Sequence, residues 1–221
     1  MVCHIVNSKE EKLEAPYLKL YSAGASPFAK KVKALLNLLK LDYHLLNLDF
    51  SKKEQKEPWF LEINPRGKVP VLEHVDSNGN KVVISESLAI LNYIANKFDT
   101  KREFSFSFDD PLYYDALEWS IYYVSTFEPA KVQQFIQLKQ PVEEQNRQIL
   151  EKANATLDDS FGFLEAKLKK NNNGFLVGDH LSIVDLFAYP CVVFGSVTFD
   201  SEKFPFVKAW TEKLDSLKLF E

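Results

Sequence analysis

The sequence predicts an α/β domain followed by an all-helical domain, and two observations support this fold class. Before residue 98, short strand-like runs alternate with helical runs, which is typical of a layered α/β arrangement. From Pro111 onward, apolar residues recur at helical spacing throughout. We therefore expect domains at 16–98 and 111–221, joined by a linker at 99–110. A chain of 221 residues with 46% hydrophobic residues is large enough to bury a core in each.

The first domain is expected to contain strands and helices in alternation. Ser26 is placed as the N-cap and Pro27 as the first residue of a helix whose apolar residues run to Leu39. Asn78-Gly79 is a hairpin signal. Residues 1–15 are polar and indicate an extension. A solvated loop or short helix is expected at 52–57, before residues 58–60 re-enter the core, and a second long helix is expected to begin at 85–87. The expected strands are 17–21, 43–48, 71–72 and 81–84.

The stretch from Asn64 to Leu72 joins a Pro-Arg-Gly turn to a proline at the start of an apolar run. Pro70 cannot donate to a strand ladder, so it belongs at a strand's first residue, an edge or a bulge. The Val69–Pro70 bond is also a candidate for the cis form in a tight turn. A strand end blocked by proline beside a helix start leaves several backbone groups facing one cleft. This arrangement favours an edge that binds a peptide.

The second domain is expected to be helical throughout. The alternation of Phe104, Phe106 and Phe108 indicates either a strand or, as we favour, a linker held against both domains. Ser182 to Asp185 forms a capping box, with Leu181 and Leu186 as its hydrophobic staple. The helix faces are residues 112, 116, 119, 123 and 127, then 142, 149, 153, 157, 164 and 168, then 204, 207, 210, 214 and 217, with a turn at 171–174.

Composition excludes several classes of function. A net charge of −4 argues against nucleic-acid binding, and no apolar run is long enough to span a bilayer. The first residues lack the basic region and apolar core of a signal peptide. Cys3 and Cys191 are too few for a disulfide scaffold, and no metal-ligand spacing occurs, so no metal site is predicted. We expect a soluble cytoplasmic protein with no membrane or nucleic-acid partner.

The blocks Gly67-Lys68-Val69-Pro70 and Glu86-Ser87-Leu88-Ala89-Ile90, in this order and at this spacing, resemble the thioredoxin-like half of the cytosolic glutathione transferases. Gly174 to Asp179, leading into the capping box, resembles the helical half of the same family, although Val184 stands where the family usually has alanine. The resemblance covers roughly residues 16–218. It implies a thioredoxin-like N-terminal domain followed by an all-α C-terminal helical domain.

The resemblance also implies glutathione as co-substrate. In the family, the residue before the cis-proline, here Val69 before Pro70, pairs its backbone with the cysteinyl part of glutathione. The Glu-Ser pair, here Glu86 and Ser87, binds the γ-glutamyl carboxylate. Lys68 matches the lysine that tau and omega members use on the glycyl carboxylate, and its alternative is a solvated surface charge.

Ser26 is the candidate catalytic residue. Ser26-Pro27-Phe28-Ala29 resembles the start of the first helix in serine-type, tau-like members, where omega and lambda members carry cysteine. A hydroxyl at the N-terminus of a helix can stabilise the glutathione thiolate without a metal or a histidine. The alternative is that Ser26 only caps its helix, and Ser22 is then the next candidate. Tyr21 fits the buried end of a strand.

Two functions remain open at this point. The first is a glutathione transferase that conjugates glutathione to small hydrophobic electrophiles, with reduction of peroxides as a side activity. The second is a non-catalytic relative, such as a transferase-like regulatory protein or a module of a translation elongation complex. The family resemblance also implies a homodimer. The aromatic residues Tyr113, Trp119, Tyr122, Tyr123 and Phe127 identify no substrate, because such a stripe is more often core.

Overall fold

The computed structural model describes residues 2–6, 13–24, 26–195 and 199–220. The chain forms two compact units, the first running to Thr100 and the second from Lys101 to Leu219. Of the sequence features above, residues 7–12 of the expected extension and Ala25 in the break before the first helix lie outside the described residues.

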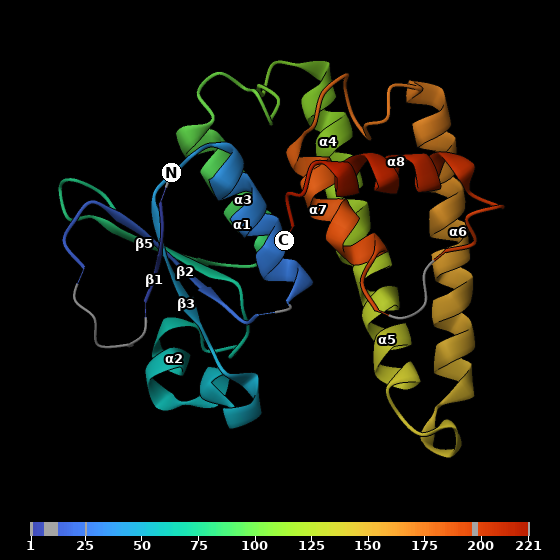
Figure 1. The fold of residues 1–221 in the computed structure, drawn as a ribbon, viewed down its shortest axis with the longest axis horizontal. Helices are drawn as coiled ribbons and strands as arrows, with labels where there is room; N and C mark the ends of the chain where they lie inside the picture. The colour runs from blue at the N-terminus through green and yellow to red at the C-terminus, as the bar shows by residue number, and fades with distance from the viewer. Residues whose placement is uncertain (1, 7–12, 25, 196–198, 221) are drawn as a thin grey trace. The chain divides into compact units, whose positions relative to one another are not determined.

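The first unit is built on a five-stranded mixed sheet with the order β1-β3-β2-β4-β5 (Figure 1). Strands β1, β3 and β2 are parallel, and β4 runs antiparallel to both β2 and β5. The four expected strands are confirmed. The strands are β1 (Cys3–Ile5), β2 (Tyr17–Ser22), β3 (Tyr43–Asn47), β4 (Val71–Val75) and β5 (Lys81–Ser85).

Strand β1 corrects the interpretation of the N-terminus as a mere extension. It lies along the outer edge of β3, where the Tyr43 amide donates to the Val2 carbonyl at 3.1 Å and the Val6 amide donates to the Leu45 carbonyl at 2.9 Å. Val6 is only 3% exposed and belongs to a core cluster of this unit. Residues Cys3–Ile5 therefore add a strand to the sheet.

Three helices cover this sheet: α1 (Pro27–Leu38), α2 (Pro58–Ile63) and α3 (Ser87–Phe98). Helices α1 and α3 pack side by side (Figure 1). Helix α2 follows two short 3-10 turns at 50–52 and 54–56, as expected for the charged stretch, and buries Phe60 completely. Phe60 packs in a cluster with Tyr21 and Val71, and Val69 packs against the same cluster. The core therefore fixes the backbone that leads into β4.

The β4–β5 hairpin forms as the Asn78-Gly79 signal predicts. The Asp76 carboxylate accepts from the Asn78 and Asn80 amides, both at 2.9 Å. Gly79 has φ +81°, a conformation that residues with a Cβ rarely adopt. This turn sets the register of β4 against β5.

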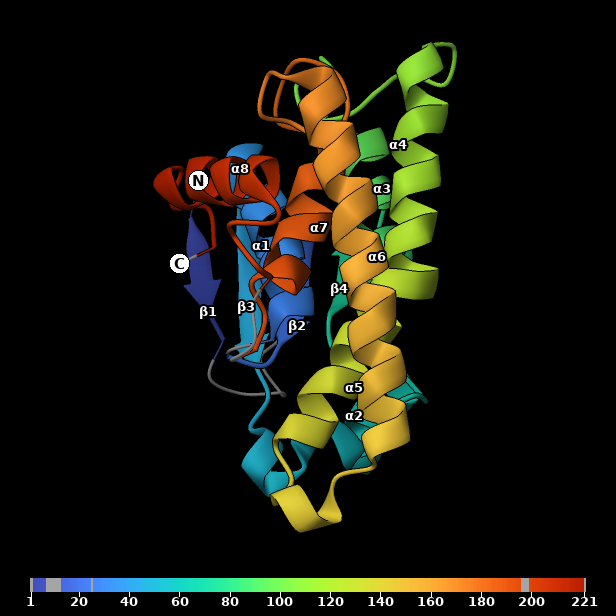
Figure 2. The same ribbon diagram turned by 90° about the vertical axis from the view of Figure 1, so that its right-hand side faces the viewer.

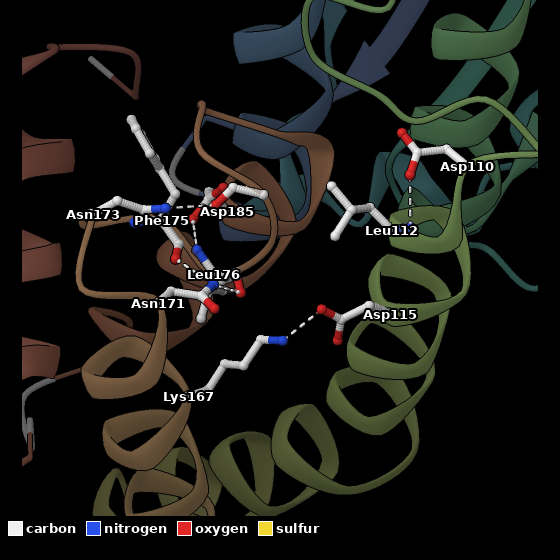
Figure 3. A network of polar contacts seen from close by, with 10 residues as sticks. Asp110, Leu112, Asp115, Lys167, Asn171, Asn173, Phe175, Leu176 and Asp185 are labelled. Carbon is white, nitrogen blue, oxygen red and sulfur yellow. Dashed lines mark hydrogen bonds and ion pairs between the residues drawn. The ribbon is translucent and has the colours of Figure 1, made fainter.

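The second unit is helical, as expected. Its helices are α4 (Pro111–Tyr122), a π-turn (Tyr123–Phe127), α5 (Glu128–Leu138), α6 (Arg147–Asn171), α7 (Ile183–Val192) and α8 (Pro205–Ser216). Helix α5 packs along α6 (Figure 2). Lys167 of α6 donates to Asp115 of α4 at 2.5 Å (Figure 3). Val142, expected in the long helix, lies instead in a 3-10 turn and is 69% exposed, because α6 starts only after its N-cap Asn146.

The predicted capping box is present and forms the centre of a buried polar network (Figure 3). Asp185 is fully buried and accepts from the Leu176 amide and Trp210 Nε1, both at 2.9 Å, and from the Ser182 amide at 3.0 Å and hydroxyl at 3.1 Å. Asn171 Nδ2 donates to the Leu176 carbonyl at 2.7 Å. Burial raises the pKa of Asp185, and the donors around it act in the opposite direction. The network joins the 171–182 loop to α7 and α8.

The linker forms no strand. Phe106 is 6% exposed and its ring lies against Gly178 and the His180 ring, whereas Phe108 is 70% exposed. The Ile183 amide donates to the Phe104 carbonyl at 2.8 Å. The Phe108 ring, although exposed, packs against the Tyr113 and Tyr114 rings with centroids 5.5 Å and 5.9 Å apart. The segment is therefore fastened to the helical unit by the rings of Phe106 and Phe108 and by the Phe104 carbonyl.

Candidate functional site

One end of the sheet collects the elements that carry the predicted site residues. In the strand register, Tyr21 pairs with Val71, and Val71 pairs with Ser85. The end of β2, the start of β4 and the end of β5 therefore lie side by side. The chain continues from β2 to Ser26, enters β4 from Pro70 and leaves β5 through Glu86.

The Val69–Pro70 bond is cis, as the sequence of this turn suggested. Pro70 is buried and immediately precedes β4, where its missing N–H costs no ladder bond. Val69 is half-buried against the core cluster, and the Lys68 side chain is exposed. The backbone here is fixed, while the Lys68 ammonium is accessible to solvent.

The turn before this bond is held by one buried side chain. Asn64 is 3% exposed; its Oδ1 accepts from the Arg66 amide at 3.2 Å and its Nδ2 donates to the Lys68 carbonyl at 2.7 Å. The Gly67 amide donates to the Asn64 carbonyl at 2.8 Å. Gly67 has φ +57°, and a Cβ there would lie 2.6 Å from the Gln55 carbonyl oxygen, so only glycine fits. The turn is consequently rigid on both sides of Arg66.

Glu86 has a backbone conformation that is unusual for a residue with a side chain. Its φ is +89° and its ψ is 116°, and it is the N-cap of α3. Such conformations cost about 1–3 kcal/mol and cluster at ligand sites. Within the described part of the chain, the Glu86 side chain makes no capping bond to α3, and Ser87, the first helical residue, is 7% exposed. The first N–H groups of α3 are thus suited to an anion.

Arg66 connects the two blocks. Its Nη1 lies 2.6 Å from Glu86 Oε1, and its Nη2 donates to Ser85 Oγ at 3.2 Å. No role for Arg66 was predicted from the sequence, because this residue is only the middle of a Pro-Arg-Gly turn, twenty residues from Glu86. The contact between Arg66 and Glu86 follows from the β4–β5 register. The signal in the sequence that could have predicted it is a pair of opposite charges at the two ends of a hairpin.

Ser26 is the N-cap of α1, and its Oγ accepts from the Ala29 amide at 3.4 Å. The hydroxyl therefore acts as a helix cap. A serine hydroxyl that accepts one bond still has its own proton to donate, so capping and thiolate binding are compatible. Ser26 is partly exposed, whereas the competing Ser22 is 7% exposed at the end of β2.

Tyr21 is the buried end of a strand, as predicted. Its ring is 3% exposed and its hydroxyl donates to Glu73 Oε2 at 3.3 Å. Burial and the Glu73 carboxylate raise the pKa of the Tyr21 hydroxyl. The Tyr21 hydroxyl is engaged in the core of the sheet.

Metal-binding clusters and membrane-spanning helices are both absent from the described residues. No three His, Cys, Asp or Glu side chains in this part of the chain are arranged to hold a metal ion. No helix in the described ranges is long and apolar enough to cross a membrane.

Family models match both units. The model described as "Glutathione S-transferase, N-terminal domain" matches residues 16–96, and the model described as "Glutathione S-transferase, C-terminal domain" matches residues 121–217. Glutathione S-transferase 1 of Dianthus caryophyllus is 30% identical over 199 residues, which cover 89% of this chain and 86% of that protein. Glutathione S-transferase 2 of Schizosaccharomyces pombe is 43% identical over 109 residues, and the match spans only 49% of this chain and 46% of that protein.

Solved structures show the same fold. The crystal structure of a glutathione transferase homologue from Lodderomyces elongisporus, with two glutathione molecules per subunit, has a TM-score of 0.82 and 27% identity, covering 92% of this chain and 95% of that one. The expected thioredoxin-like domain followed by an all-α domain is confirmed by this likeness and by the elements themselves. The chain belongs to the glutathione S-transferase family.

Proposed function

We propose that this protein is a glutathione transferase that activates the thiol of glutathione with Ser26 and conjugates it to small hydrophobic electrophiles. The observation that supports the proposal best is the meeting of the cis Val69–Pro70 turn and the strained Glu86 at one sheet end, linked by Arg66. As a side activity, the same thiolate attacks a peroxide oxygen, releasing an alcohol and forming glutathione sulfenic acid, which a second glutathione converts to glutathione disulfide and water. Relatives named glutathione S-transferase support this assignment.

Glutathione is held by five residues of the first unit. The Val69 backbone, fixed by the turn before Pro70, pairs with the cysteinyl part. Ser87 and the first N–H groups of α3 receive the γ-glutamyl carboxylate. The Glu86 carboxylate would repel another carboxylate, so it faces the ammonium of the same γ-glutamyl group. The exposed Lys68 ammonium reaches the glycyl carboxylate.

Ser26 supplies the chemistry. A thiol with a pKa of about 8.5 is only a few per cent thiolate near neutrality. Lowering that pKa by about two units requires ~2.7 kcal/mol of stabilisation of the anion. A hydrogen bond to a charged group contributes about 1.5–3 kcal/mol, and a helix N-terminus about 0.3–1 kcal/mol. The Ser26 hydroxyl at the N-terminus of α1 combines both effects.

The conjugation step then needs only the thiolate. The thiolate sulfur donates an electron pair to an electrophilic carbon, forming a carbon–sulfur bond, and the leaving group or an adjacent π-bond takes the displaced electrons. Ser26 acts as donor to sulfur in the ground state and does not itself form a bond to substrate.

We further propose that the protein is a homodimer. Within the second unit, Tyr114, Ile121 and Val124 are exposed on α4 and its π-turn, and Phe163 of α6 is 58% exposed. Tyr114 and Ile121 are seven residues apart and share one helix face. Large apolar side chains exposed together favour burial against a second copy.

The proposal is tested by retention on a glutathione resin together with a conjugation assay. We expect the parent protein to be retained and to conjugate, and Ser26→Ala to be retained but slow. Asn146→Ala, which removes the side-chain cap of α6, is the matched control for loss of a helix cap and should conjugate at the parental rate. Retention without conjugation by the parent would identify a non-catalytic member of the family. No retention and no conjugation would refute the proposal.

A further inference from the structure

Arg66 forms a contact that the proposed binding set does not explain. Its guanidinium lies 2.6 Å from the Glu86 carboxylate and also donates to Ser85 Oγ. We propose that Arg66 is a specificity residue for glutathione: with Glu86 it forms a clamp for the zwitterionic α-amino acid head of the γ-glutamyl group. Glu86 takes the ammonium, and Arg66 joins Ser87 and the first N–H groups of α3 in binding the carboxylate. This inference rests on the proposed function and deepens it.

Stability does not account for this ion pair. The Arg66 and Glu86 side chains are 59% and 57% exposed. Exposed ion pairs contribute little to folding stability, because solvent screens them and because ordering a long arginine side chain costs entropy. A contact of so little value to folding, placed beside a residue with φ +89°, is more consistent with a role in binding.

The backbone that carries Arg66 is held by neighbouring side chains. The Asn64 side chain accepts from the Arg66 amide, and Lys56 Nζ donates to the Arg66 carbonyl at 3.3 Å. Gly67 has no room for a Cβ, so the turn cannot shift easily toward another conformation. The Arg66 guanidinium therefore extends from a fixed turn toward the start of α3.

The chemistry of the pair fits an α-amino acid. In such a group the ammonium and the carboxylate are attached to the same carbon, so the site needs opposite charges side by side, as Arg66 and Glu86 provide. A guanidinium carries five N–H donors in one plane, and the contacts of Arg66 with Glu86 and Ser85 leave other donors for a carboxylate. Glu86 Oε1 contacts Arg66, and the second oxygen of this carboxylate, Oε2, can accept a hydrogen bond from an ammonium.

The test compares three ligands by calorimetry: glutathione, its analogue without the α-carboxylate (4-aminobutanoyl-Cys-Gly) and its analogue without the α-amino group (glutaryl-Cys-Gly). We expect Arg66→Ala to weaken glutathione binding about 10- to 150-fold, the range for one charge-assisted hydrogen bond. The same variant should bind the analogue without the carboxylate as the parent does. Glu86→Gln should show the converse pattern, losing affinity for glutathione but not for the analogue without the amino group.

Two further variants separate binding from structure. Arg66→Lys keeps the charge but not the planar fork, so it should recover only part of the affinity. Arg147→Ala removes an exposed arginine from the second unit and should leave all three affinities unchanged. The thermal midpoint of Arg66→Ala should match that of the parent, whereas a merely structural role would lower it.

The outcomes distinguish the two proposals. Equal glutathione affinity in the parent and Arg66→Ala, or an equal loss for all three ligands, would overturn the role of Arg66 alone. Tighter binding by Arg66→Ala would show that Arg66 masks Glu86 and would also overturn it. If the parent binds no glutathione, the proposed function and this inference fail together.

Discussion

Replacing Glu86 should separate ligand affinity from folding stability. Glu86→Ala removes one charge-assisted hydrogen bond to the bound ammonium, worth about 1.5–3 kcal/mol, so the dissociation constant for glutathione should rise by about 10- to 150-fold. The lost ion pair with Arg66 is exposed on both sides and contributes only about 0–1 kcal/mol to folding. Calorimetry should therefore show a large loss of affinity, while urea unfolding shows a small change in the free energy of unfolding.

The backbone of Glu86 provides a second variant at the same position. Alanine would keep a Cβ at φ +89°, whereas glycine tolerates positive φ. Glu86→Gly should therefore bind glutathione as weakly as Glu86→Ala does. Its free energy of unfolding should exceed that of Glu86→Ala by about 1 kcal/mol, which is the lower end of the cost of such strain. Parental affinity in either variant would refute the assignment of Glu86 to the ligand. A lower stability for glycine than for alanine would refute the strain argument.

Three other predictions follow from the second unit. Asp185→Ala leaves four buried donors without their acceptor, each worth about 1–3 kcal/mol, so the free energy of unfolding in urea should fall by ~4 kcal/mol. The cap variant Ser182→Ala should lose only about 1 kcal/mol, and equal losses in the two variants would contradict the network. Burial lowers the pKa of Lys131 from 10.5 to about 8. Between these pH values the unfolded chain binds more protons than the folded chain, so the free energy of unfolding of the parent should increase as pH rises. The increase should be smaller in Lys131→Gln, and parallel curves of stability against pH for the two proteins would exclude Lys131 as the cause. Phe163→Glu should change the sedimenting species from a dimer to a monomer. Val142 is 69% exposed, and Val142→Glu should remain a dimer. A dimer in both variants would place the interface elsewhere.

Local signals in the sequence were sufficient for most of the fold. Ser26 and Pro27 mark the start of α1, Asn78-Gly79 marks the hairpin, and Ser182 to Asp185 marks the start of α7. Each is a short-range feature in which a side chain or a backbone conformation stops one element and starts another. Such features are visible in a single sequence because they depend on residues only a few positions apart.

Strand β1 could not be predicted in this way. Cys3 to Ile5 is three residues long, too short for an alternation to be recognised, and it pairs with residues 43–45 about forty positions away. Its stability comes from the free edge of β3, from the buried Val6 and from the stacking of the His4 and His44 rings with centroids 5.1 Å apart. None of these exists before the sheet has formed.

The candidate site was predicted in part. The resemblance to a family supplied Ser26, Lys68, Val69, Pro70, Glu86 and Ser87, and these assignments remain proposals. The positive φ of Glu86 and the Arg66–Glu86 contact were not predicted. Both depend on the register that brings the end of β5 beside the start of β4, which is a property of the folded sheet.

The state of the bound thiol tests the central claim most directly. The ultraviolet absorbance of the thiolate, followed against pH in the complex with glutathione, gives the pKa of the bound sulfur. We expect the pKa to lie about two units below the free value of about 8.5 in the parent, and to return most of the way in Ser26→Ala with little change in affinity. The matched cap variant Asn146→Ala should titrate like the parent. An equally lowered pKa in Ser26→Ala would show that Ser26 only caps α1, and an unshifted pKa in the parent would contradict thiolate stabilisation by this site.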